Sequence, residues 1–273
     1  MSTEIVLMWA AVTLYTIGAI GFVFGVVFKA EKLTWAALWV SLAGLVPHAI
    51  AIGIRWVQLG HAPYLGFYEV VSSYAFAAVL ALGVLVMVRP QLKVAGIAVM
   101  PIAVLMIGGA MLAPKAALDL TPTLASYWLT IHVTFAKLSY SSFIAAFAVA
   151  LVYLVRDRRP GFLATLPAQR VLDDISFRFV AVGFIFLSIM IVAGAIWANE
   201  AWGRYWGWDP IETWSLISWV VYAGYLHANL TLGWKGTRCA WYAVLALPVM
   251  VFTLIGVPIA YQSIHGAYLT GPK

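Results

Sequence analysis

The sequence has few charged residues and almost no cysteine. Asp, Glu, Lys and Arg make up 10% of the 273 residues, and Cys239 has no second cysteine in the chain with which to form a disulfide. Intrinsic disorder, nucleic-acid binding and an extracellular disulfide scaffold require abundant charge, basic clusters or paired cysteines, so these classes are excluded. The chain instead has 64% hydrophobic residues and a mean hydropathy of +0.97, which indicates an integral membrane protein.

Long apolar runs occur throughout the chain. A bilayer core about 30 Å thick requires roughly 20 residues at the helical rise. Eight runs meet this length: residues 5–28, 33–54, 68–88, 94–112, 127–155, 179–198, 212–232 and 240–260. Only Met-Ser-Thr-Glu precedes the first run, so we expect a retained helix and not a signal peptide. The sequence predicts an all-α polytopic membrane protein with about eight transmembrane helices, in which residues 1–273 form a single membrane domain.

Lysine and arginine are distributed unevenly over the predicted loops. The loops after the odd-numbered runs hold eleven of these residues, whereas the even-numbered loops and the tail hold only Arg55, Lys115, Arg204 and Lys273. Because short positively charged loops remain in the cytoplasm, we expect both termini on the outer side of the membrane. The outer regions are then residues 55–67, 113–126 and 199–211.

The third outer region belongs to a tryptophan-rich loop over residues 199–214. Six tryptophans occur in and around it: Trp197, Trp202, Trp206, Trp208, Trp214 and Trp219. An aromatic belt that anchors helix ends would explain one or two of them, but it does not require Gly203 and Gly207 between the rings. Asp209 followed by Pro210 is typical of a helix start. A flat shelf of indole rings separated by small residues would suit a large planar ligand, and haem is the obvious candidate.

Haem iron needs axial ligands, and neutral imidazole is a common one. His132 lies at the outer start of the fifth run and His265 just beyond the outer end of the eighth, so we predict a bis-histidine site for the haem iron. His227 lies roughly 22 Å into the seventh run, in the inner half of the membrane, where ionisable residues are usually functional. A second haem site there would need a further ligand. For His48, a hydrogen bond between helices is at least as good an explanation as a metal role, and His61 has no obvious partner.

Charged residues in the outer regions have structural explanations, and the two arginines also have a functional one. Glu69, near the start of the third run, fits a favourable interaction with the positive end of a helix. Arg55 and Arg204 either pair with haem propionates or anchor the chain at the interface. No catalytic residue is assigned. The expected cofactor-binding residues are His132, His265, His227, Trp202, Trp206, Trp208, Asp209 and Arg204.

With these residues identified, the chain resembles the CcsA (ResC) family of system II cytochrome c assembly proteins. The resemblance extends over nearly the whole length and is most specific at residues 202–216, which look like the tryptophan-rich WWD signature of haem handlers. His132, His227 and His265 match, in order, the family's outer, membrane-embedded and outer histidines. Ile211 and Gly66 depart from the pattern, since many relatives carry Lys and Asn at these positions.

The resemblance implies a haem-handling subunit of a cytochrome c synthase (haem lyase). Such a subunit moves haem b to the outer membrane face and presents it for thioether attachment to the Cys-x-x-Cys-His segment of apocytochrome c. The resemblance also implies a membrane partner of the CcsB (ResB) type and a place in the bacterial cytoplasmic membrane or the thylakoid membrane. Three alternatives stay open: a cytochrome b-like electron-transfer subunit, a haem-free scaffold that regulates haem synthesis, and haem export without attachment.

Overall fold

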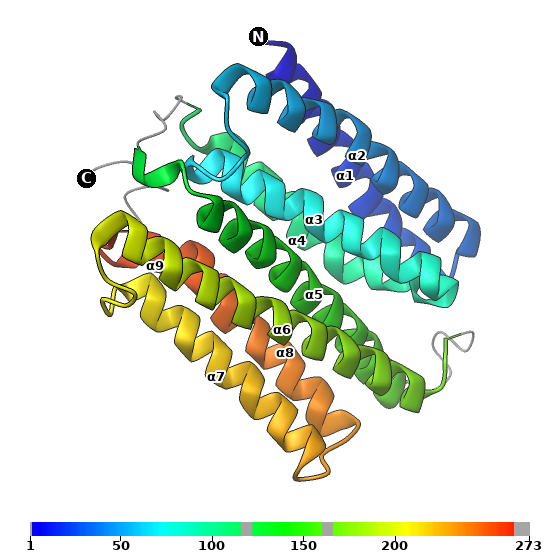
Figure 1. Ribbon diagram of the computed structural model, residues 1–273. Coiled ribbons are helices and arrows are strands. Elements are labelled where there is room, and N and C mark those ends of the chain that lie inside the picture. Colours follow the sequence, from blue (N-terminus) through cyan, green and yellow to red (C-terminus); the bar gives the residue numbers. More distant parts are fainter. Residues whose placement is uncertain (1, 116–121, 160–165, 265–273) are drawn as a thin grey trace.

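The computed structural model describes residues 2–115, 122–159 and 166–264, and all regular structure within them is helical. The described residues form eight long helices, and these helices lie side by side (Figure 1). Their bounds are α1 (Thr3–Val27), α2 (Glu31–Leu59), α3 (Gly66–Val88), α4 (Gly96–Leu112), α5 (Tyr127–Arg158), α6 (Gln169–Trp202), α7 (Pro210–Leu230) and α8 (Thr237–Val251). Short helical stretches complete the fold: the 3₁₀ helices η1 (Pro90–Ala95) and η2 (Pro122–Leu124), the π-helical η3 (Phe252–Gly256) and α9 (Val257–Ala260).

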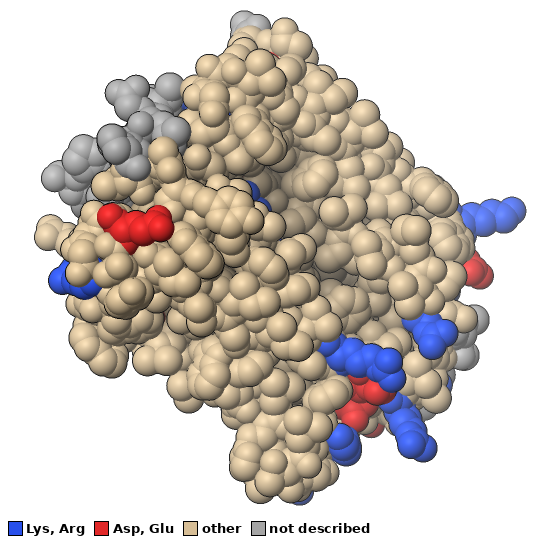
Figure 2. Space-filling view, viewed as in Figure 1, with Lys and Arg blue, Asp and Glu red and all other residues tan. Residues whose placement is uncertain are grey.

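The helices confirm the predicted membrane architecture. Seven helical stretches of the described residues are long and apolar enough to cross a membrane, and the last of them runs continuously from Thr237 to Ala260. The seventh predicted run corresponds to α7, which is less apolar because it carries Glu212, Ser215 and Ser218. Charged side chains on the visible face gather mainly at the two ends of the helices (Figure 2). The protein is an all-α, multi-pass membrane protein.

Successive long helices alternate in direction. As a result, α1 begins and α9 ends at the same end of the bundle as the connection between α6 and α7 (Figure 1). This connection, residues 203–209, is called the α6–α7 loop below, and its end of the bundle is called the loop end. The loop of residues 60–65 between α2 and α3 also lies at the loop end, as does the start of α5.

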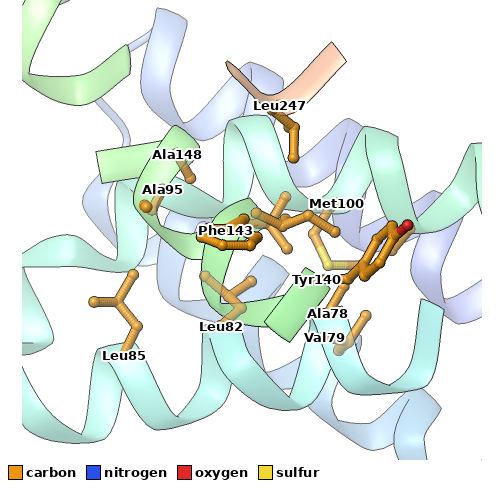
Figure 3. Close-up of a cluster of buried hydrophobic side chains, with 14 of the residues drawn as sticks. Ala78, Val79, Leu82, Leu85, Ala95, Met100, Tyr140, Phe143, Ala148 and Leu247 are labelled. Carbon is orange, nitrogen blue, oxygen red and sulfur yellow. The ribbon is translucent and has the colours of Figure 1, made fainter. Parts of the chain in front are cut away.

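Helix α5 lies at the centre of the bundle, in contact with α3, α4, α6 and α8. Phe143 of α5 is buried with Leu82 of α3 and Met100 of α4 (Figure 3). Against α6, the same Phe143 ring faces Gly183, where a Cβ would lie 2.8 Å from the ring. Small residues at such contacts allow membrane helices to approach closely. This tight packing fixes α5 and α6 relative to each other.

Candidate functional site

A pocket opens at the loop end between α3, α5, α6 and α7. It contains about 1090 Å³ of space that no protein atom occupies, open solvent at its mouth included. The cavity itself measures about 160 Å³, less than the roughly 300–1,000 Å³ of ligand pockets, so a large ligand would also have to occupy the open mouth. Six aromatic side chains line the wall among aliphatic ones: Tyr64, Tyr74, Tyr140, Trp197, Tyr205 and Trp206. No group of three His, Cys, Asp or Glu side chains among the described residues could hold a metal ion.

His132 of α5 lines this pocket in a defined orientation. Its Nδ1 lies 2.9 Å from the carbonyl oxygen of Met190 on α6. In a neutral ring whose Nδ1–H donates to that carbonyl, the lone pair is at Nε2, and histidines that bind metals are commonly held in this way. The close approach depends on Gly194, because a Cβ there would lie 2.5 Å from Nδ1 of His132. Helix α6 therefore orients the imidazole that the sequence predicts as an iron ligand.

The three indoles expected to form a flat shelf have different environments. Trp206 lines the pocket, whereas the Trp208 ring is 68% exposed and meets Trp206 edge to face at 5.9 Å and 89°. Trp202 instead packs against buried Trp197, with ring centroids 4.9 Å apart. The chain turns at Gly203 (φ 73°) and again at Trp208 (φ 57°), so the three rings point in different directions. The expectation of a flat shelf was therefore wrong.

Asp209 begins α7, as the sequence predicts. Its Oδ1 accepts a hydrogen bond from the Ile211 amide at 3.0 Å, and Glu212 completes a capping box by accepting from the Asp209 amide at 3.1 Å. Glu212 also accepts from the Gly207 amide at 2.8 Å, so the end of the α6–α7 loop is fixed to the first turn of α7. The exposed Arg204 side chain lies against Gly207, where a Cβ would be 2.6 Å from its guanidinium carbon.

Among the described residues, His227 and His48 do not line the pocket. His227 is exposed on the surface of α7 and is not among the residues that line the pocket. His265 lies outside the described residues. Nδ1 of the buried His48 lies 3.1 Å from the Tyr15 hydroxyl on α1, which is the hydrogen bond between helices proposed as an alternative to a metal role.

A buried cluster of charged groups holds the loop of residues 60–65, which supplies Tyr64 and Leu65 to the pocket wall. Glu69, in the first turn of α3, accepts from Arg55 Nε at 2.8 Å and from the Leu65 amide at 3.3 Å. From the other side, Lys137 of α5 donates to the Pro63 carbonyl at 2.9 Å. Glu69 therefore has the structural role that the sequence suggested, and three helices fix this part of the wall.

Arg55 and His61 belong to the same cluster. A second carboxylate, that of Glu4 on α1, lies 3.7 Å from the Arg55 guanidinium, so Arg55 is paired within the protein. His61 is buried, with Nδ1 2.9 Å from the Ala62 carbonyl and 3.8 Å from Glu69 Oε2. Its ring packs near Tyr64, whose pKa is raised by burial and by the negative charge of Glu69. Tyr64 therefore presents a neutral hydroxyl.

Sequence reasoning missed several residues of the pocket wall. Tyr74 of α3 and Tyr140 of α5 have ring centroids 4.9 Å apart and both line the pocket. Neither lies in an outer region or in a recognisable motif, so no local signal marks them. The segment of residues 60–69 did carry a signal, because Gly, His, Pro, Tyr and Glu are concentrated between two apolar runs. Its role as a pocket wall required the structure.

Comparisons with known proteins agree with the resemblance. The family described as "Cytochrome C assembly protein" matches residues 64–265. A relative named cytochrome c biogenesis protein CcsA, from Synechococcus sp. (strain CC9605), is 35% identical over 271 residues, covering 85% of this chain and 89% of the relative. The protein of the same name from Guillardia theta is 32% identical over 275 residues, covering 91% of both chains.

A solved structure shares the fold. The structure titled "Cytochrome c Heme Lyase CcmF" superposes with a TM-score of 0.73 and covers 98% of this chain. The match spans 48% of that longer chain at 15% sequence identity, so the likeness concerns the fold alone. The helical bundle therefore has a fold that is known from a solved protein. The chain belongs to the CcsA family of cytochrome c assembly proteins and has a role in cytochrome c biogenesis.

Proposed function

We propose that this chain is the haem-handling subunit of a cytochrome c synthase and presents haem for covalent attachment at the outer membrane face. One observation carries the proposal: a pocket with an aromatic wall contains an imidazole whose Nδ1 is hydrogen-bonded to a backbone carbonyl. In this proposal the loop end is the outer end, as the distribution of Lys and Arg predicts. Family membership supports haem as the substrate.

The proposed binding residues have distinct tasks. Nε2 of His132 is one axial ligand of the iron, and His265 is the other. Trp206, with the neighbouring Tyr205, contacts the porphyrin from the pocket wall. Outside the pocket, Trp208 and Arg204 are exposed on the α6–α7 loop, where they face the approaching apocytochrome. Trp202 supports the loop by packing against Trp197.

The attachment reaction requires little chemistry from the chain itself. Haem supplies two vinyl groups, and each cysteine thiol of the Cys-x-x-Cys-His segment adds across one of them. The sulfur bonds to one vinyl carbon and the proton goes to the other, so no oxidant or reductant is consumed. Holding thiol and vinyl together makes the addition effectively unimolecular. The task of the pocket is therefore to orient haem and exclude water.

A second membrane protein completes the proposed assembly. An exposed imidazole such as His227 is costly where it faces lipid. A helix from a partner of the CcsB (ResB) type would cover it and supply a second ligand for haem on its way from the cytoplasmic side. An electron-transfer subunit fits less well, because the described residues contain no histidine pair at matching depths: His48 bonds to Tyr15, and His227 lies on the surface of α7.

Replacing His132 tests this function directly. His132→Gly should lower the yield of c-type cytochrome made by the chain co-expressed with its partner. Residues that merely orient a metal ligand are worth about 10- to 100-fold in affinity, so losing the ligand should cost at least as much. Imidazole added to the medium should restore part of the yield by occupying the vacated position. The measurement is haem-stained cytochrome c per unit of immunodetected variant protein.

His61→Gly is the matched control, because His61 lies behind the pocket wall and does not line the pocket. Its yield should not respond to imidazole. Normal maturation by His132→Gly would reject the pocket as the haem site.

A further inference from the structure

The carboxylate of Asp209 makes contacts of different kinds with two described residues, Ile211 and Ile264. Its Oδ1 accepts from the Ile211 amide at 3.0 Å, which is an ordinary helix cap. Its Oδ2 accepts from the amide of Ile264 at 2.8 Å, a residue 55 positions later that follows α9. A helix cap does not require this second contact. Because Asp209 is only 7% exposed, both bonds are largely shielded from competing water.

We propose that Asp209 is a positioning residue that ties the α6–α7 loop to the chain immediately before His265. The inference rests on the proposed function in one respect, namely that His265 ligates haem iron. Successive Cα atoms are about 3.8 Å apart, so an anchor on the Ile264 amide restricts where the next residue can reach. Asp209 thus holds the chain that leads to the proposed second iron ligand, and we assign it no contact with haem of its own.

The anchor is rigid on the Asp209 side. Glu212 accepts from the amides of Gly207 and Asp209 at 2.8 and 3.1 Å, which fixes the backbone that carries the carboxylate. Glu212 and Trp206 both line the pocket. One capping box therefore connects the pocket wall, the start of α7 and the segment after α9.

The segment after α9 obtains little anchorage from burial. Helix α9 (Val257–Ala260) ends the continuous helical stretch that begins at Thr237, and the backbone is extended at its C-cap residue, Tyr261. Tyr261 and Ile264 are 43% and 40% exposed. A hydrogen bond to a charged acceptor is stronger than one between neutral groups, so the Asp209 contact contributes substantially to the position of Ile264.

The Asp209→Asn variant distinguishes this positioning role from simple helix capping. Asn and Asp are about equally good helix caps, so a residue that only caps α7 tolerates Asp209→Asn. An amide side chain has one oxygen, however, and its NH₂ group cannot accept from the Ile264 amide. Asp209→Ser is the second variant, because its short hydroxyl can cap α7 but cannot reach Ile264.

The first experiment measures backbone hydrogen exchange in the haem-free, detergent-purified full chain. In both variants the Ile264 amide should exchange roughly tenfold faster than in wild type, the effect of losing one hydrogen bond to a charged group. The first-turn amides of α7 should retain their protection. Unchanged exchange at Ile264 in both variants would overturn the proposal.

The second experiment records absorption spectra of the haem-loaded protein. Asp209→Asn and Asp209→Ser should lose low-spin bands as His265→Ala does, and added imidazole should restore them. If His265→Ala changes the spectrum but neither Asp209 variant does, the positioning role fails and the proposed function stands. If neither His132→Gly nor His265→Ala changes the spectrum, the outer haem site itself fails, and the positioning role fails with it.

Discussion

At the scale of single residues, the site depends on how His132 is held. The Met190 carbonyl fixes one ring nitrogen, and Gly194, one turn later on the same helix, leaves room for the ring. Neither residue has a chemical role of its own. Their effect is to keep the imidazole in one tautomer and one direction, which is how second-shell groups tune metal ligands.

Gly194→Ala should displace His132 without removing it. The added Cβ would lie 2.5 Å from Nδ1, so the ring must turn away from Met190. We expect haem affinity to fall about tenfold, the lower range for loss of an orienting partner. Haem titration of the purified variant measures this. Gly183→Ala is the matched control, since Gly183 lies on the same helix as Gly194 and its added Cβ would crowd Phe143 of α5. Equal losses in both variants would indicate general damage to packing.

The roles of individual residues were predictable only where neighbouring residues in the sequence indicate them. The cap formed by Asp209 was expected from the following Pro210, and the structure confirms it. The flat indole shelf was not found, because backbone conformation at Gly203 and Trp208 decides where each ring points. The contact of His132 with Met190 joins residues 58 positions apart. It depends on the register between α5 and α6, which hydropathy does not encode.

At the scale of elements, the α6–α7 loop divides its tryptophans between the pocket and the surface. Trp206→Ala should reduce haem retention and cytochrome c maturation more than Trp208→Ala, because only Trp206 of this pair lines the pocket. Both variants should insert into the membrane normally. Retained haem and membrane-bound protein are measured side by side. If the two variants lower only insertion, and to the same extent, the indoles are interfacial anchors.

Helix positions were predictable from apolar runs, whereas helix lengths were not. The sixth run suggested residues 179–198, but α6 extends from Gln169 to Trp202. Hydropathy detects only the part of a helix that lies in the bilayer core, and α6 continues through Arg170, Asp173 and Asp174 beyond it. The extra turn at its other end brings Trp202 against Trp197 and sets the start of the α6–α7 loop.

At the scale of the whole molecule, the pocket wall combines residues that are far apart in the chain, on α3, α5, α6, α7 and the segments next to them. Residues from Tyr64 to Leu254 line it. The family resemblance was predictable from residues 202–216 and is confirmed by the comparisons. The ion pair between Arg55 and Glu69 supports the pocket wall at residues 60–65. It was not predictable, because each of the two residues had a separate explanation in the sequence.

The central claim is that the loop end holds haem between His132 and His265. The most direct test is the visible absorption spectrum of the detergent-purified chain, with and without its co-expressed partner, beside the His132→Gly/His265→Ala double variant. The account predicts sharp low-spin bands in the reduced wild-type protein and their loss in the double variant, with recovery on adding imidazole. Bands of equal strength in the double variant would contradict it.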